Sequence, residues 1–239
     1  MEQLLIFGLP GLLGLYFAYS AFGHFSSARA ASSVPTRTVS NVSEGLVEVQ
    51  GTAKASRPLT SPVKGTPCVY YRYKVERLVQ KNRGTKWETV DQGSSDNFPF
   101  LCDDGTGEIE IYAQGAEFFA RKDHGVLSRS VTNFGSDQAV PAEFRNVLGS
   151  MGKSLGSLVG GTSRVTEELL MPGDALYVLG AAFRTADGKW GIRKGPSAPF
   201  VLSNLGESVV VRQLYTKAFW EILGAAGVAA FLWFYVRGR

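Results

Sequence analysis

The stretch Cys68–Glu76 reads CVYYRYKVE, and its alternating side chains decide the fold class. Apolar and aromatic side chains occupy every second position and point to one side: Val69, Tyr71, Tyr73 and Val75. The intervening side chains point to the other side: Tyr70, Arg72, Lys74 and Glu76. A period of two residues is typical of a half-buried β-strand. We expect this strand to extend through Val79.

Turn and strand signals surround this strand on both sides. The sequence from Lys81 to Gly84 is a turn, from which Lys86–Asp91 returns as a hairpin partner. Other strands are expected at Leu46–Ala53, Phe98–Cys102, Gly107–Tyr112, Ala175–Phe183, Lys189–Arg193, Phe200–Ser203 and Ser208–Leu214. A helix is expected at Pro141–Lys153 and a short helical turn at Thr166–Leu170. The pattern predicts a mainly β, antiparallel domain, barrel-like or sandwich-like, with one or two short helices.

Both ends of the chain are strongly apolar. Leu4–Phe22 carries no charge, and Phe219–Val236 carries one, Glu221, in its first turn. A bilayer core of about 30 Å requires ~20 apolar residues in a helix, so each segment predicts a transmembrane helix. A cleaved signal peptide is the alternative for the first segment, and a buried core helix for the second. Between them we expect a juxtamembrane linker over 23–43 and the β-rich domain over 44–216.

Two spans would place both termini on one side of the membrane. Arg237 and Arg239 favour cytoplasmic termini, since cytoplasmic flanks are rich in basic residues. The central domain is then extracytoplasmic. Small residues recur at four-residue spacing in both segments: Gly14/Ala18, Ala225/Ala229 and Ala226/Ala230. Such rows let helices pack closely, on each other or on another chain.

The composition excludes several classes of site. The 239 residues include two cysteines and two histidines, which is too few for a multi-zinc or disulfide-dense scaffold. His24 and His124 have no neighbouring ligands, and no triad motif accompanies them. Gly149–Ser154 lacks the spacing of a phosphate loop. We therefore predict no catalytic residue, cofactor or metal, and no nucleic-acid partner.

The adjacent acidic pairs are poor candidates for a paired-carboxylate site. Asp103 and Asp104 lie next to predicted strands, where neighbouring side chains point to opposite faces. Glu167 and Glu168 are expected to begin the helical turn, where carboxylates favour the N-terminal dipole.

Two further groups of residues leave alternatives open. Cys68 and Cys102 either form a disulfide in an extracytoplasmic domain or are two small buried apolar side chains. Lys81, Arg83 and Lys86 either form a solvated hairpin face or contact anionic lipid.

Three blocks of sequence resemble the GIDE, or Beside-a-Membrane, domain family. The blocks are Ser61–Tyr71 (SPVKGTPCVYY), Phe98–Gly107 with its DGTG turn, and Glu167–Gly180 with EELLMPGD. The resemblance covers nearly the whole chain, from the first apolar segment to the second. It implies structural roles for these motif residues: Ser61, Pro62, Gly65, Pro67, Cys68, Tyr71, Asp104, Gly105, Gly107, Glu168, Gly173, Asp174 and Gly180.

The resemblance also carries a functional expectation. Eukaryotic members of the family are mitochondrial outer-membrane ubiquitin ligases, in which a RING finger after the second span carries the activity. The two cysteines and two histidines here are too few ligands for a RING finger. Family members without a RING finger resemble prokaryotic proteins, which implies a bacterial inner-membrane location with a periplasmic domain.

We therefore expect a membrane-anchored interaction or sensor module without a catalytic site. Its partners would be the lipid bilayer and another membrane protein, or a second copy of the chain. The alternatives are ubiquitin-ligase-like activity, implied by the family, and a lipid-binding envelope domain.

Overall fold

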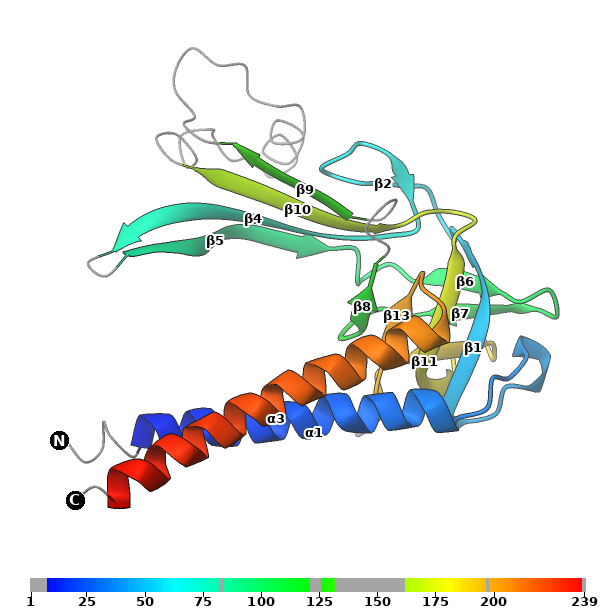
Figure 1. Cartoon of the computed structure of the whole chain (residues 1–239). Coiled ribbons are helices and arrows are strands. Elements are labelled where there is room, and N and C mark those ends of the chain that lie inside the picture. The colour runs from blue at the N-terminus through cyan, green and yellow to red at the C-terminus, as the bar shows by residue number, and fades with distance from the viewer. Residues whose placement is uncertain (1–7, 82–83, 121–125, 132–161, 197, 238–239) are drawn as a thin grey trace, which may run out of the picture.

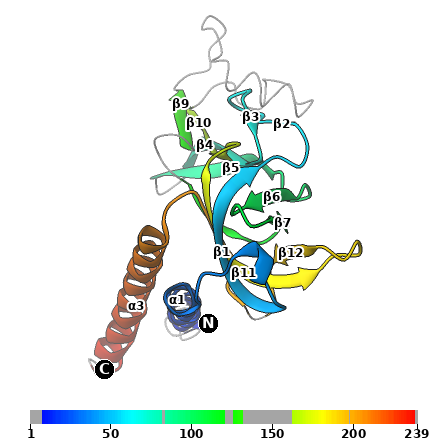
Figure 2. The same ribbon diagram turned by 90° about the vertical axis from the view of Figure 1, so that its right-hand side faces the viewer.

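The protein folds into a mainly β domain joined to two long helices (Figure 1). The structure is a computed structural model that describes residues 8–81, 84–120, 126–131, 162–196 and 198–237; over 126–131 it describes the backbone alone. Viewed from the side, the four-stranded sheet lies above the strands of a barrel, and the two helices lie below (Figure 2).

A closed five-stranded barrel forms the centre of the domain. Its strands, in order around the barrel, are β1 (Gly45–Lys54), β6 (Phe100–Asp103), β7 (Glu108–Ile111), β12 (Trp190–Arg193) and β11 (Ala175–Arg184). The barrel closes where β1 pairs with β11, from Gly45↔Ala182 to Thr52↔Ala175. The predicted barrel is thereby confirmed. However, the β7–β12 pairing is parallel, so the expectation of a purely antiparallel domain is wrong at this seam.

Two glycines allow the barrel to pack tightly. A Cβ atom on Gly51 would lie 2.5 Å from the carbonyl oxygen of Asp103, close to where β1 leaves β11 and joins β6. A Cβ atom on Gly180 would lie 2.7 Å from both Ile192 and Phe200. Gly180 is therefore a packing residue of the core, which is the structural role that the resemblance implies.

A four-stranded antiparallel sheet projects from the barrel. It comprises β5 (Gly84–Ser94), β4 (Tyr70–Lys81), β10 (Ser163–Leu170) and β9 (Val126–Val131), in that order. The hairpin predicted around Lys81–Gly84 is confirmed by the pairing of those two residues. The helical turn predicted at Thr166–Leu170 is wrong, because the segment is strand β10. Burial on β10 alternates with a period of two, which is the signature of a strand.

Short elements complete the domain. They are the 3₁₀ helix η2 (Val39–Asn41) and the strands β2 (Leu59–Thr60), β3 (Pro67–Cys68), β8 (Glu117–Phe119) and β13 (Val201–Ser203). β2 pairs with β3, and β13 connects β11 to β8. The β8–β13 pairing is the second parallel one.

Two long helices lie against one side of the barrel. They are α1 (Leu9–Ser33) and α3 (Glu207–Arg237). The first turns of α3 replace the strand predicted at Ser208–Leu214, and α1 continues through residues 23–33 of the predicted linker. Helical spacing explains both differences, because Ala28 and Ala31 on α1 and Val210 and Leu214 on α3 are buried in one apolar cluster with barrel residues.

The two helices pack on each other through glycines. A Cβ atom on Gly14 would lie 3.2 Å from Val228, and one on Gly224 would lie 3.4 Å from Phe17. Gly14 belongs to a predicted small-residue row. The sequence left open whether this row packs on the other helix or on another chain. In the structure, Gly14 packs on α3 of the same chain.

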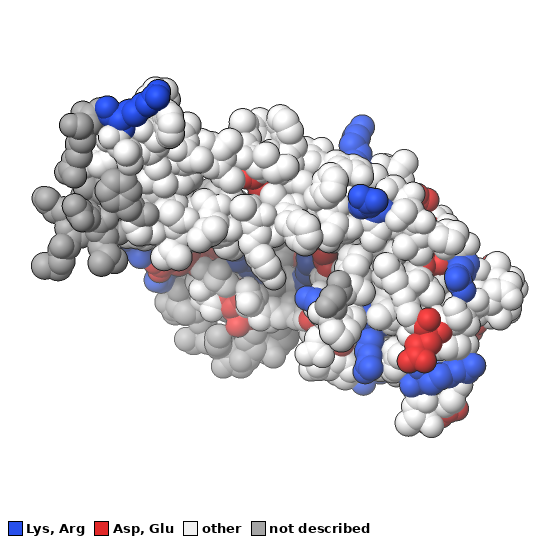
Figure 3. All heavy atoms as spheres, turned by 90° about the horizontal axis from the view of Figure 1, so that it is seen from below, with Lys and Arg blue, Asp and Glu red and all other residues white. Residues whose placement is uncertain are grey.

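One helix in the described part of the chain, Glu207–Arg237, is long and apolar enough to cross a membrane. The predicted first span, Leu4–Phe22, begins within residues 1–7, which the structure does not describe. The exposed side of the helical pair, seen in Figure 3, is almost free of charged side chains.

Cys68 and Cys102 are free thiols, and both are buried. The structure therefore contains no disulfide between Cys68 and Cys102, and both side chains pack as small apolar residues. Cys102 lies in the barrel core, while Cys68 closes the β2–β3 pair. The predicted helix Pro141–Lys153, Gly149–Ser154 and His124 lie outside the described residues.

Candidate functional site

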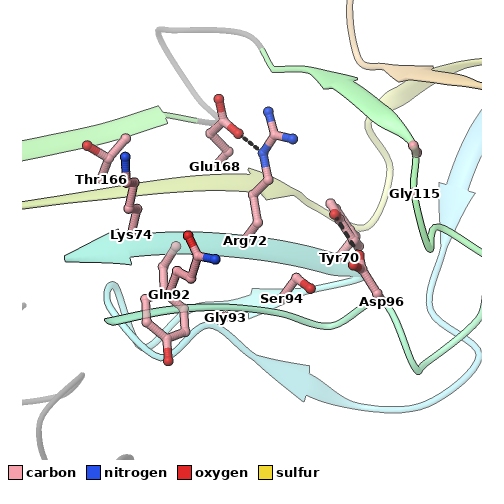
Figure 4. Close-up of a pocket in the computed structure, with 12 residues that line it drawn as sticks. Tyr70, Arg72, Lys74, Gln92, Gly93, Ser94, Asp96, Gly115, Thr166 and Glu168 are labelled. Atoms are coloured by element: carbon pink, nitrogen blue, oxygen red, sulfur yellow. Dashed lines mark hydrogen bonds and ion pairs between the residues drawn. The ribbon is translucent and has the colours of Figure 1, made fainter. Parts of the chain in front are cut away.

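A polar groove lies between the four-stranded sheet and the barrel. Its volume is about 650 Å³, and strands β4, β5 and β10 provide most of its lining. Gly115 and Ala116, which precede β8, form the opposite wall. Figure 4 shows the lining residues.

Strand register gathers the polar side chains of the groove. Arg72 on β4 lies opposite Glu168 on β10, and Lys74 lies opposite Thr166. Alternation places these four side chains on the same face of the sheet. The sequence correctly places Arg72 and Lys74 on the opposite face of the strand from Tyr71 and Tyr73. It does not predict that β4 pairs with β10, because it assigns a helical turn to the β10 residues.

Arg72 connects the sheet to the barrel. Its Nε atom forms an ion pair with Glu168, and its Nη2 atom donates a hydrogen bond of 2.9 Å to the backbone oxygen of Phe118 on β8. The guanidinium also lies 5.5 Å from the centre of the Phe118 ring. Glu168 is therefore more than the structural motif residue that the resemblance implies, because its carboxylate lines the groove.

Tyr70 closes the inner end of the groove. Its hydroxyl donates a 2.9 Å hydrogen bond to Asp96, while its ring packs edge-on against Phe118 at 5.2 Å. Burial, followed by the charge of Asp96, raises the pKa of the Tyr70 hydroxyl. The hydroxyl is therefore protonated at physiological pH and acts as a hydrogen-bond donor.

Three groove side chains have unused hydrogen-bonding capacity. Within the described residues, the side chains of Gln92, Ser94 and Thr166 make no hydrogen bond. Gln92 and Ser94 lie on β5, which pairs only with β4 among the described strands and so presents a free backbone edge. Side chains and strand edges of this kind can receive an extended peptide.

The lining of the groove is mostly polar and charged. Its lining supplies hydroxyl, amide, carboxylate and cationic groups, but no cysteine or histidine within the described residues. The described residues also contain no cluster of three or more histidine, cysteine, aspartate or glutamate side chains suited to a metal ion.

A buried carboxylate fixes one motif block to another. Glu167, fully buried, accepts hydrogen bonds from the Ser61 hydroxyl at 3.1 Å and from the backbone N–H groups of Val63 and Lys64 at 3.0 and 3.1 Å. Burial raises the pKa of Glu167, although these hydrogen bonds act in the opposite direction. The Ser61–Thr66 loop is thus attached to β10, on the face that bears Glu167.

The other motif residues occupy turns and close contacts. Gly65, Gly105 and Gly173 have φ values of +69°, +84° and +89°, which glycine adopts most readily. Asp104 accepts the backbone N–H of Val39 at 2.7 Å, and Asp174 accepts that of Met171 at 2.9 Å. Gly107 packs against Val39, and Tyr71 stacks on Tyr73. Pro62 lies within the Ser61–Thr66 loop, and Pro67 follows the loop at the start of β3.

The predicted basic hairpin lies away from the groove. Lys81 forms an ion pair of 2.7 Å with Glu88, and Lys86 is exposed, whereas Arg83 lies outside the described residues. Figure 1 shows this end of the β4–β5 hairpin on the same side of the molecule as both termini.

Sequence comparison identifies the family. The sequence model of the GIDE family, described as an E3 ubiquitin ligase family, matches residues 69–234. Among curated proteins, none matches the chain. The match includes the groove strands, four of the five barrel strands and most of α3, so this chain belongs to the GIDE family.

Proposed function

We propose that this GIDE-family protein is a membrane-anchored interaction module that binds an extended polypeptide segment in the groove. The groove carries the proposal, because it combines unpaired side chains on Gln92, Ser94 and Thr166 with the free edge of β5. A peptide backbone has the donors and acceptors that such a surface requires. The partner is another membrane protein or a second copy of the chain.

The rigidity of the groove favours binding. Arg72 connects the sheet to β8, and the Tyr70 hydroxyl is bound to Asp96, so both walls are fixed before a partner arrives. Pre-organised surfaces lose less conformational entropy on association. The groove does not need to close to receive a segment.

Photo-crosslinking in membranes tests this proposal. A photoreactive phenylalanine at Gln92 should form an adduct with a discrete polypeptide, and a second substitution, Thr166→Arg, should abolish it by filling the groove. The matched control places the same photoreactive residue at Lys189, which is exposed on the β11–β12 turn. An absent adduct at Gln92, or equal adducts at both positions, would reject groove binding.

We propose further that both apolar segments cross the membrane and place the domain outside the cytoplasm of a bacterial cell. Three observations support this topology: the apolar helix Glu207–Arg237, the packing of α1 along it, and the uncharged face of the pair (Figure 3). Arg237 follows the second apolar segment, where basic residues mark the cytoplasmic side.

A lipid contact at the hairpin is a second candidate function. The observation in its favour is that the hairpin end and both termini lie on one side of the molecule (Figure 1). This contact competes with the two-span topology, because that topology separates the termini from the domain by the thickness of the bilayer. An environment-sensitive dye on Thr85→Cys, an exposed position next to the turn, should shift to the blue in nanodiscs containing anionic lipid. Charge reversal at Lys81, Arg83 and Lys86 should remove the shift; a shift that persists would reject the contact.

The family description makes ubiquitin transfer the remaining alternative. Purified chain supplied with ubiquitin, the activating enzyme and conjugating enzymes would form conjugates if this alternative holds. If the chain forms no conjugates while a known ligase forms them under the same conditions, ubiquitin transfer is rejected.

A further inference from the structure

A second cavity lies between α1 and the barrel. Its volume is about 560 Å³, and its α1 wall runs from Tyr19 to Ser27. The barrel side supplies Glu117 on β8 together with Lys194, Pro196, Ala198, Pro199 and Phe200. No residue of the predicted functional sites lines this cavity.

The cavity lies at the level where the apolar segments end. Its α1 wall includes Phe22, the last residue of the first apolar segment, and His24 just beyond it. His24 Nδ1 lies 2.8 Å from Glu221 Oε2, which places His24 beside the first turn of the second apolar segment. With both segments spanning, as proposed above, the cavity opens at the headgroup layer of the bilayer.

One wall of the cavity suits hydrocarbon. The side chains of Tyr19 and Phe22 are 80% and 71% exposed on α1. Aromatic side chains with this exposure favour the interface between lipid and water. A small soluble anion would gain nothing from them, whereas a lipid would bury them under its acyl chains.

The opposite wall offers one available cation beside a carboxylate that is already paired. The carboxylate of Glu117 is already paired with Lys217 at 2.6 Å and lies 3.6 Å from His24 Nε2. Glu221 is bound by His24 and by the Ser20 hydroxyl at 2.7 Å. Lys194, by contrast, is exposed and has neither an ion pair nor a side-chain hydrogen bond within the described residues. Its cation is therefore available to a phosphodiester.

We propose that this cavity binds the phosphate headgroup of an anionic glycerophospholipid. Lys194 contacts the phosphate, and the acyl chains pass over Tyr19 and Phe22 into the bilayer. The inference rests on the proposed anchoring of both helices. It assigns to the α1–barrel junction a lipid site that borders the peptide groove at Gly115 and does not include the basic hairpin.

Photolabelling of the full chain in vesicles tests this site. The vesicles contain phosphatidylcholine and a phosphatidylglycerol whose headgroup carries a diazirine. Illumination should label peptides that contain residues 19–27 or 194–200. Lys194→Gln should reduce this labelling about fivefold, the factor expected for one lysine at an anionic surface, and Lys194→Glu should reduce it further.

The control variants are Lys189→Gln and Lys189→Glu, which make the same charge changes at the exposed β11–β12 turn and should leave labelling unchanged. Equal labelling of the Lys194 and Lys189 variants would overturn the site, as would displacement of the label by inorganic phosphate.

Flotation of the vesicles distinguishes failure of the lipid site from failure of the membrane anchoring. A chain that floats with the vesicles but is not labelled at these peptides refutes the lipid site alone, and a chain that does not float refutes the anchoring and this site with it.

Discussion

Glu167 is the residue on which the attachment of the Ser61–Thr66 loop depends. Its carboxylate accepts three hydrogen bonds in a fully buried position. Glu167→Ala would remove the carboxylate that accepts hydrogen bonds from the buried Val63 N–H and the buried Ser61 hydroxyl, so it should lower the free energy of unfolding by about 1–3 kcal/mol. Glu167→Gln keeps one acceptor oxygen and should cost less. Chemical denaturation in detergent measures both, with exposed Glu44→Gln as the control.

The raised pKa of Glu167 also predicts a pH dependence. The folded protein holds this proton more tightly than the unfolded chain, so stability is greatest below the unfolded-state pKa of the carboxyl. It falls as the pH rises through the folded-state pKa. Glu167→Gln should flatten that decline. A variant with the same pH profile as the wild type would show that Glu167 does not titrate in this way.

The two thiols should be unreactive in the folded protein. Burial raises the pKa of Cys68 to about 11 and that of Cys102 to about 12, so little thiolate exists at neutral pH. A thiol reagent should label neither cysteine under native conditions and both after denaturation. Reductant should leave the melting temperature unchanged. A reductant-dependent melting temperature would instead reveal a disulfide.

At the scale of elements, Gly14 determines how closely the two helices pack. Gly14→Leu would press against Val228, whose Cγ1 atom lies 3.2 Å from the position of a Cβ atom. Overpacking of this kind should cost about 1–3 kcal/mol. Gly11→Leu is the matched control, because a Cβ atom there would meet nothing within 4 Å. Thermal unfolding in detergent compares them; equal stability would place the helix contact elsewhere.

The sequence predicts strands reliably where alternation is strong and the turn is local. The β4–β5 and β6–β7 hairpins follow from their patterns and turn residues, and they form as predicted. Strand β10 does not follow, because the adjacent acids Glu167 and Glu168 resemble the start of a helix. Only the tertiary structure shows one buried under the Ser61–Thr66 loop and the other paired with Arg72.

The groove could be predicted only in part for the same reason. Arg72 and Lys74 are placed on one face by alternation, but their partners come from β10, far along the chain. Gln92 and Ser94 carry no sequence signal, since their role depends on β5 lying at the sheet edge. The Lys194 cavity is equally invisible, because it requires α1 to continue past the predicted span.

At the scale of the whole molecule, one apolar cluster fastens the helices to the barrel. Leu214 on α3 is fully buried in it beside Tyr177 and Leu179 of β11. Leu214→Ala should therefore lower the free energy of unfolding by about 2–5 kcal/mol. Arg212→Ala, an exposed change two residues away from Leu214 on α3, is the control. Denaturation monitored by circular dichroism measures both, and equal stabilities would mean that the cluster does not join the two parts.

The central claim is that the domain is held outside the cytoplasm between two membrane spans. A membrane-impermeant maleimide applied to spheroplasts tests it with three single-cysteine variants, made in a background without Cys68 and Cys102: Gln3→Cys, Lys189→Cys and Arg237→Cys. We expect labelling of Lys189→Cys in intact spheroplasts, and of the two terminal variants only after permeabilisation. Labelling of Gln3→Cys together with Lys189→Cys in intact spheroplasts would contradict it, because α1 would then not cross the membrane.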